Sequence, residues 1–209
     1  MFHTETITYG PVDVHLLYYE HFEMNEHLHN LLPKEHLRLP QYGHPLRRRE
    51  FIATRVLRTM VFGNEPILYS PIGAPYIEEE GFISISHAHQ VVGLAFCKSF
   101  PIGLDLEPIR PKVLRVTSKF LSPEEQSKLN TSDVLEMIKV WSGKEALYKL
   151  AGRKGIIFSK ELLLEKRDNL LWNGKIEFSD LKKHVELTID VKNDFVISIN
   201  ASPIYERKK

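Results

Sequence analysis

The sequence has few of the features that mark secreted, membrane-spanning or nucleic-acid-binding proteins. Its single cysteine, Cys97, excludes an internal disulfide and any zinc site built from several cysteines, and it fits a reducing compartment. No apolar run approaches the roughly 20 residues that cross a bilayer, and residues 1–6 lack the layout of a signal peptide. The formal net charge of only +1 argues against general binding to nucleic acid or membranes. We therefore expect a cytoplasmic protein with neither as a partner.

What is present is typical of a globular protein. The 209 residues suffice for one large domain or two small lobes, and a 43% share of hydrophobic residues can fill a packed core. The charge is unevenly distributed, because residues 31–60 hold seven basic side chains against two acids. The basic residues are Lys34, Arg38, Arg47, Arg48, Arg49, Arg55 and Arg58. Such a cluster indicates either a polyanionic small-molecule ligand or a solvated helix face.

Two acidic segments carry the clearest chemistry. The first is predicted to be a strand at 103–107, in which Asp105 and Glu107 share one face and the leucines between them bury the other. The second is predicted to be a helix, in which Trp141, Glu145 and Lys149 stack four residues apart. If this helix packs on this strand, three carboxylates meet beside a lysine. Such a set of oxygen ligands suits Mg²⁺ that holds a phosphate-bearing substrate.

Each segment alone has a plainer interpretation. An isolated Asp-x-Glu is usually the exposed face of a half-buried strand. Glu145 with Lys149 is a common surface pair that stabilises a helix by only about 0.2–0.5 kcal/mol. Trp141 on the same stripe favours a covered face instead. Gly103 points the same way, because the missing side chain allows another backbone or a ligand to approach the strand.

The rest of the sequence predicts an α+β fold. Strands are expected at 12–19, 67–69, 82–86, 91–97 and 102–107, with three or four more between 156 and 201. Long helices are expected at 46–62 and 134–150, each followed by a glycine, and a shorter helix begins after Ser122 as its cap.

A third segment, Ser84-Ile85-Ser86-His87, precedes the acidic strand, and with it the chain resembles a known family. The three segments are similar in kind and order to those of the 4′-phosphopantetheinyl transferase superfamily. Its signatures are (S/N)-I-S-H, G-(I/V/L)-D-(I/L/V)-E and W-(S/T)-x-K-E-(A/S)-x-x-K. The last is matched here at Trp141, Lys144, Glu145 and Lys149. Three ordered motifs are far more specific than either acidic motif alone.

The resemblance implies a fold and a division of the chain. The family's fold is α+β, with two similar lobes in a pseudo-twofold arrangement, each an antiparallel sheet packed with a long helix, and an active site at the lobe interface. We expect a basic N-terminal lobe at 1–100 on the adenosine-phosphate side of the cofactor. We expect the metal-binding and catalytic lobe at 101–209. The length favours the larger, monomeric, surfactin-synthetase-activating type over the shorter type with a site between subunits.

The resemblance also implies roles for the acidic cluster. Asp105, Glu107 and Glu145 would bind Mg²⁺, with Mn²⁺ as an alternative. Asp105, Glu145 and Lys149 would be catalytic, with Glu145 helping to deprotonate the incoming serine and Lys149 neutralising a pyrophosphate. Lys144 would assist from the flank.

Coenzyme A would be held by residues from several segments. Ser86 and His87 match family residues that contact its phosphates. The run from Arg48 to Arg55 resembles the family's (K/R)-R-x-x-F-(L/I)-A-G-R segment, which binds the adenosine 3′-phosphate, with Thr54 in place of glycine. The expected cofactor-binding residues are Lys34, Arg38, Arg48, Arg49, Arg55, Ser86, His87, Lys144 and Lys149. Ala74 replaces the lysine of the family's Gly-Lys-Pro, so one phosphate contact is expected to be missing.

We therefore interpret the chain as a holo-[acyl-carrier-protein] synthase. It would transfer the 4′-phosphopantetheine arm of coenzyme A to a serine of an apo acyl or peptidyl carrier protein and release 3′,5′-ADP, in fatty-acid, polyketide or nonribosomal-peptide biosynthesis. Two alternatives stay open. One is a non-catalytic module that binds coenzyme A or a carrier protein, and the other is a Mg²⁺-dependent hydrolase of the same pyrophosphate. Carrier proteins of this kind are acidic, so the basic stretch at 111–130 is expected to dock them.

Overall fold

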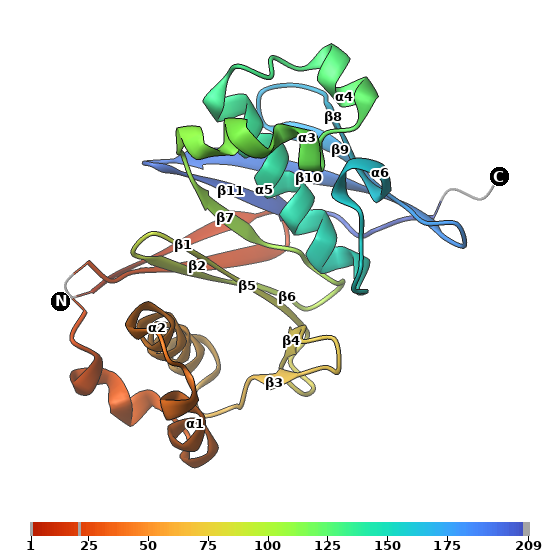
Figure 1. Ribbon diagram of the computed structural model, residues 1–209. Coiled ribbons are helices and arrows are strands. Elements are labelled where there is room, and N and C mark those ends of the chain that lie inside the picture. The colour runs from red at the N-terminus through yellow and green to blue at the C-terminus, as the bar shows by residue number, and fades with distance from the viewer. Residues whose placement is uncertain (1, 21, 207–209) are drawn as a thin grey trace.

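The computed structural model describes residues 2–20 and 22–206, and it contains two large antiparallel sheets (Figure 1). The first sheet has the strand order β1-β2-β6-β5. Its strands are β1 (His3–Tyr9), β2 (Val12–Tyr18), β5 (Phe82–Ala88) and β6 (Val91–Cys97). Between β2 and β5 the chain forms η1 (Met24–Asn30), α1 (Pro33–Arg38), η2 (Leu39–Gln41), α2 (Pro45–Phe62) and the small hairpin of β3 (Leu68–Tyr69) and β4 (Pro75–Tyr76).

The second sheet has the strand order β7-β11-β10-β9-β8. Its strands are β7 (Asp105–Pro108), β8 (Leu162–Lys166), β9 (Leu171–Glu177), β10 (Lys182–Lys192) and β11 (Phe195–Asn200). Helical segments connect β7 to β8 and cover the outer face of this sheet. They are η3 (Pro111–Val116), α3 (Thr117–Phe120), α4 (Pro123–Lys128), α5 (Val134–Ala151) and α6 (Phe158–Glu161).

The molecule is layered as helix, sheet, sheet and helix. Figure 1 shows α2 on the outer side of the first sheet and α5 on the outer side of the second. The two sheets face each other through a common apolar core. Its buried members include Val14, Leu16, Ala95, Leu104, Leu106, Ile197 and Ile199. The predicted α+β fold, with an antiparallel sheet and a long helix in each lobe, is therefore confirmed.

Both long helices begin and end where the sequence indicates. The α2 helix starts with Pro45 after His44, whose side chain accepts a hydrogen bond from the amide of Leu46, and it ends at Gly63. In α5 the side chain of Asp133 caps the first turn, and Gly152 ends the helix in the left-handed conformation with a φ of 66°. Among the residues that the structure describes, no helix is both long enough and apolar enough to cross a membrane.

Two predictions about strands were wrong in detail. The strand expected at 102–107 begins only at Asp105, because the preceding amides bond outside the ladder. Gly103 donates to the side chain of Asn200 and Leu104 to the hydroxyl of Ser84, each at 2.9 Å. The first strand, β1, was not expected at all. Among the described strands it is an edge strand that pairs with β2 alone, and its three threonines and one acid, Glu5, leave little apolar alternation.

Side-chain hydroxyls join the two sheets at their edges. Strands β5 and β7 are both edge strands, yet the amides of β7 do not point into solvent. The Ser84 hydroxyl accepts from the amide of Leu104, and the Ser86 hydroxyl accepts from the amide of Leu106 at 3.1 Å. This serine seam, formed by Ser84 and Ser86, holds the end of β5 beside Asp105.

The backbone of helix α5 closely approaches the chain at Gly103. A Cβ atom added there would lie 2.3 Å from the carbonyl oxygen of Ala146 and 2.8 Å from Cγ of Leu150. The expectation that glycine admits another backbone at this point is confirmed. The contact brings the middle of α5 against the start of β7.

We predict that Gly103→Ala lowers the free energy of unfolding by about 1–3 kcal/mol, because the added methyl overpacks a rigid backbone contact. Urea denaturation would measure it. Gly43→Ala is the control, since a Cβ added there meets no atom within 4 Å. Its effect should stay within about 0.5 kcal/mol. Equal losses in the two variants would mean that α5 does not press on residue 103.

Candidate functional site

The acidic cluster forms where α5 packs on β7. Asp105 and Glu107 come from the strand, and Glu145 and Lys149 come from the helix. The ammonium of Lys149 donates to Oδ1 of Asp105 at 3.1 Å and to the carbonyl oxygen of Leu104 at 2.5 Å. Asp105 is only 4% exposed, so this ion pair lies largely out of water. The structure thus brings together the four residues that the two acidic segments predict.

The three carboxylates act on one another electrostatically. Burial, together with the charge of Asp105, raises the pKa of Glu145 to about 7. The same two causes raise the pKa of Glu107 to about 7, against the opposing hydrogen bond from Trp141. Glu145 makes no hydrogen bond to any described residue, and Lys149 offsets only part of the repulsion. The cluster therefore carries more negative charge than its own cation balances.

Several carboxylate oxygens are left without partners. Oδ2 of Asp105 is buried and has no hydrogen bond to a described residue, and within the same part of the chain Glu107 uses only Oε1, which accepts from the indole of Trp141 at 2.8 Å. Within residues 2–20 and 22–206, no three His, Cys, Asp or Glu side chains form a ready-made metal site. Uncommitted, mutually repelling oxygens nevertheless have the chemistry of a divalent-cation ligand set. The donor set therefore fits Mg²⁺.

Ser86 contacts the acidic cluster directly. Its hydroxyl donates to Oδ1 of Asp105 at 3.1 Å while accepting from the amide of Leu106, and the side chain is buried. Both functions of the hydroxyl are thus used within the protein. Ser86 orients Asp105, and in this structure it does not present its hydroxyl to a cavity.

His87 lies close to several positively charged side chains. Burial, together with the charges of Lys149, Arg47 and Arg55, lowers the pKa of His87 to about 4, so the ring is neutral at neutral pH. The Thr54 hydroxyl lies 3.1 Å from Nε2 of His87 and already donates to the carbonyl oxygen of Glu50. The threonine oxygen must therefore accept from Nε2–H, which leaves Nδ1 as an acceptor.

One face of α2 lines a cavity of about 280 Å³ next to His87. The residues of this face recur at helical spacing, and they are Arg47, Glu50, Phe51, Thr54 and Arg55. Tyr42, Tyr69, Gly73, Pro75, Ile85 and His87 complete the wall. We call it the basic cavity, because Arg47 and Arg55 supply its cations.

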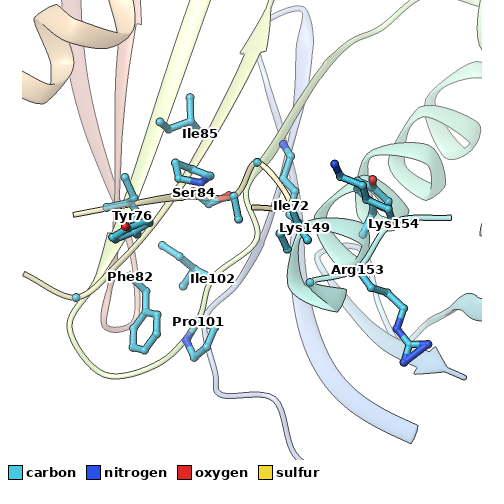
Figure 2. A pocket seen from close by; sticks show the side chains of 17 residues that line it. Ile72, Tyr76, Phe82, Ser84, Ile85, Pro101, Ile102, Lys149, Arg153 and Lys154 are labelled. Carbon is cyan, nitrogen blue, oxygen red and sulfur yellow. The ribbon is translucent and has the colours of Figure 1, made fainter. Parts of the chain in front are cut away.

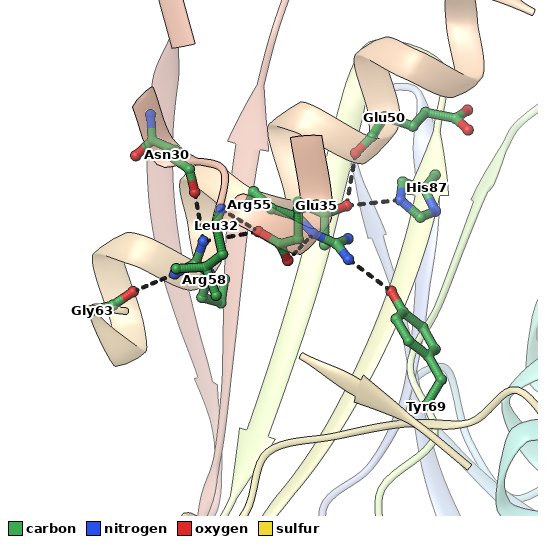
Figure 3. A network of polar contacts seen from close by, with 10 residues as sticks. Asn30, Leu32, Glu35, Glu50, Arg55, Arg58, Gly63, Tyr69 and His87 are labelled. Atoms are coloured by element: carbon green, nitrogen blue, oxygen red, sulfur yellow. Dashed lines mark hydrogen bonds and ion pairs between the residues drawn. The ribbon is translucent and has the colours of Figure 1, made fainter. Parts of the chain in front are cut away.

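Arg55 is buried in a polar network that Figure 3 shows. Its Nε donates to Glu35 at 2.8 Å, its Nη2 reaches the Tyr69 hydroxyl at 3.3 Å, and its guanidinium lies over the ring of Phe51. Nη1 has no hydrogen bond to any described residue. Arg58 is fully buried and donates to Glu35 and to two backbone carbonyls, so its role is structural.

The other predicted basic residues lie off the cavity wall. Arg48 donates through Nε to the carbonyl oxygen of Tyr42 at 2.6 Å, and Nε of Arg49 is buried without a partner among the described residues. On α1, Arg38 places its guanidinium 4.8 Å from the centre of the Tyr69 ring, and Lys34 is exposed. The structure places Arg47 on the wall instead. Counting back eight residues from Arg55 along the predicted helix would have found it.

Lys144 is directed away from the acidic cluster. It is fully buried, and its ammonium donates to Glu125 at 2.6 Å and to the carbonyl oxygens of Phe120 and Phe158 at 2.5 and 3.3 Å. Three donors thus meet three acceptors on α3, α4 and α6. The motif position next to Glu145 therefore serves the packing of α5, and it does not face either cavity.

A second cavity, of about 360 Å³, continues from the basic cavity toward the end of α5. The two share Gly73, Pro75 and Ile85 as lining residues. Figure 2 shows Lys149 and Lys154 on one side of this apolar cavity and Ile85 and Ile102 on the other. Ala74 lies on its wall, where the family pattern has a lysine. The sequence did not indicate that Arg153 and Lys154 line this cavity, since both belong to an irregular loop.

Comparison with known proteins bears on the second lobe. Residues 101–199, just under half of the chain, match the family model of the 4′-phosphopantetheinyl transferase superfamily. The match contains the whole acidic cluster and excludes His87 and Arg55. No curated protein matches the chain. Residues 101–199 are therefore similar to a domain of this superfamily, and the surfactin-synthetase-activating subtype stays a prediction.

We predict that Glu145→Gln stabilises the metal-free protein at high pH. A folded-state pKa of about 7, above the usual value, means that protonated Glu145 favours folding at low pH and that this stability is lost as the pH rises through 7. At pH 8 the variant should gain about 1–2 kcal/mol, after allowance for partial exposure. The gain should shrink at pH 5. Thermal unfolding with chelator would measure both.

Glu136→Gln is the matched control on the same helix. Glu136 is held by the amide of Asn130 and by Lys166, so removing its charge relieves no repulsion. This control should not be stabilised at either pH. A gain at pH 8 as large as that of Glu145→Gln would contradict the electrostatic explanation.

Proposed function

We propose that this protein transfers the 4′-phosphopantetheine arm of coenzyme A to a serine of an apo acyl or peptidyl carrier protein. The serine oxygen forms a new bond to the β-phosphorus, the bond from that phosphorus to the bridging oxygen breaks, and 3′,5′-ADP leaves. The match at 101–199 supports the transferase class. The specific reaction, its carrier and its metal are our inference.

One observation carries the proposal. Three carboxylates from β7 and α5 interact electrostatically beside Lys149, which also lines the apolar cavity, and the adjoining basic cavity is lined by Arg47, Arg55 and His87. A negative cluster beside a positive pocket suits a substrate that has a pyrophosphate at one point and a phosphate monoester at another, with a divalent cation between the cluster and the pyrophosphate. Coenzyme A has both groups.

Asp105, Glu107 and Glu145 would hold Mg²⁺, or Mn²⁺ in its place. When bound, this ion would polarise the pyrophosphate and neutralise charge that develops on it. Lys149 would add a fixed positive charge on the leaving side, since its ammonium already reaches Asp105. Ser86 would keep Asp105 in place through the hydrogen bond between them.

Glu145 is our proposed base. Its carboxylate has no hydrogen bond to a described residue that would have to break first, and it lies on α5 beside Lys149. It would take the serine proton as the new oxygen–phosphorus bond forms. Positioning of the two reactants would supply much of the remaining rate enhancement.

We propose that the lobe at 1–100 binds the phosphorylated adenosine end and that the lobe at 101–209 carries out the transfer. Arg47, Arg55 and the Nε2-protonated His87 surround the basic cavity, and Nη1 of Arg55 is available to a phosphate. The apolar cavity would receive other parts of coenzyme A. Because one chain supplies both lobes, we expect a monomer to be active.

We predict that the protein, incubated with Mg²⁺, coenzyme A and a panel of apo carrier proteins, adds one phosphopantetheine arm to at least one carrier. Intact-protein mass would show the addition. Chelator should abolish it, and Glu145→Gln should slow it by about 10²–10⁴-fold, as loss of a general base does. Glu136→Gln is the control and should keep the wild-type rate.

The alternatives give different results in the same experiment. Release of 3′,5′-ADP without any carrier would identify a hydrolase. Binding of coenzyme A without turnover on any carrier would identify a binding module. Either result would overturn the proposed transfer.

The carrier is proposed to dock on η3 and α3. Exposed basic side chains gather there without an acid between 110 and 121, and none has an ion pair with a described residue. They are Arg110, Lys112, Arg115 and Lys119. Arg110 also lies close enough to Glu107 to lower its pKa, so this surface borders the acidic cluster. An acidic partner is the complement of such a surface.

We predict that the double variant Lys112→Glu and Arg115→Glu raises KM for the carrier several-fold and leaves KM for coenzyme A nearly unchanged. Steady-state kinetics at low ionic strength would measure both constants. Lys98→Glu with Lys182→Glu is the control, because it makes the same charge change at the ends of β6 and β10. A carrier KM that rises equally in both double variants would point to net charge instead of this surface.

A further inference from the structure

Trp141 makes a hydrogen bond that the proposed chemistry does not yet use. Its indole Nε1–H donates to Oε1 of Glu107 at 2.8 Å, across the contact between α5 and β7. The other oxygen of this carboxylate, Oε2, has no hydrogen bond to any described residue. The indole therefore restrains one oxygen and leaves the other uncommitted.

The indole itself is held in place by a cluster of aromatic rings. Phe158 stacks on Trp141 at 5.5 Å and 24°, and Phe120 meets it edge-on at 5.3 Å. Tyr148 stacks in turn on Phe158 at 5.6 Å. Rings packed in this way allow the indole little rotation, so its N–H points in a fixed direction.

Lys144 anchors the backbone of the two phenylalanines whose rings pack on the indole. Its ammonium donates to the backbone carbonyls of both Phe120 and Phe158, while Glu125 neutralises its charge. The chain of contacts runs from this buried ion pair to the two phenylalanines, to Trp141 and to Glu107. Trp141 thus restrains the carboxylate of Glu107 directly, and Lys144 does so indirectly through the two phenylalanines.

We propose that Trp141 is a positioning residue, which holds Glu107 in the orientation that binds the divalent cation, with Phe120, Phe158 and Lys144 as its support. The proposal rests on the proposed function, because it needs the metal. Charge repulsion from Asp105 would otherwise turn the carboxylate of Glu107 away. A donor behind a ligating carboxylate typically changes metal affinity by 10–100-fold when it is removed.

The chain offers a matched control, because it has two tryptophans. Trp172 is also buried in the second lobe, and its indole N–H has no hydrogen-bond partner among the described residues. Trp141→Phe removes a donor from Glu107, whereas Trp172→Phe removes an indole that donates to nothing. Thermal unfolding of both variants would verify that they remain folded at the assay temperature.

The first measurement is Mn²⁺ binding by electron paramagnetic resonance, in the presence of coenzyme A. We expect Trp141→Phe to raise the Kd for Mn²⁺ by about 10-fold or more and Trp172→Phe to leave it within about twofold. In a Glu107→Gln background, Trp141→Phe should add little, because the donor acts through that carboxylate. Independent, multiplicative losses in the double variant would assign Trp141 a merely structural role and overturn the proposal.

The second measurement is fluorescence, since each variant contains a single indole. Mg²⁺ should change the emission of Trp172→Phe, in which Trp141 alone reports, and should not change that of Trp141→Phe. Unchanged emission in both variants, with wild-type Mn²⁺ affinity in Trp141→Phe, would overturn the positioning role while the proposed function stands. Failure of the wild-type protein to bind Mn²⁺ would overturn both, so the two failures are distinguishable.

Discussion

The close contact between α5 and the chain at Gly103 is the constraint on which the site depends. Helix α5 approaches the residue that precedes β7 so closely that no Cβ fits between them, and this contact brings Glu145 and Lys149 to Asp105 and Glu107. The cost is electrostatic, because three carboxylates share a partly buried space with one lysine. The favourable free energy of packing α5 against the second sheet must exceed the cost of this repulsion in the folded state. The fold thus holds a cluster of carboxylates whose negative charge one lysine only partly balances.

Each half of the acidic cluster could be predicted from the sequence because its spacing is local, whereas the contact between β7 and α5 is tertiary and was expected from the co-occurrence of the motifs. Alternate strand positions and helix positions four apart fix which side chains share a face, whatever the rest of the chain does. The basic cavity could be predicted only in part. Composition pointed to the arginine run, but the choice among Arg47, Arg48 and Arg49 depends on which face of α2 turns toward β5, and that is set by packing between distant segments.

Two further misses have the same origin in tertiary structure. The motif spacing gives no sign that Lys144 turns toward Glu125, because this acid lies in a different helix. Strand β1 has too little apolar alternation to be recognised alone, and it is a strand because β2 offers it a complete ladder of partners. Sequence patterns reveal a helix or strand when its own side chains favour that structure. They reveal little when pairing with a neighbouring element determines the structure.

The serine seam between β5 and β7 fixes how the two sheets lie relative to each other. A backbone ladder tolerates most side chains. This junction instead needs a hydroxyl at positions 84 and 86, and these two positions fix the register between the sheets. That register sets the span between the basic cavity in one lobe and the carboxylates in the other. The distance between the basic cavity and the carboxylates therefore depends on two small side chains, Ser84 and Ser86.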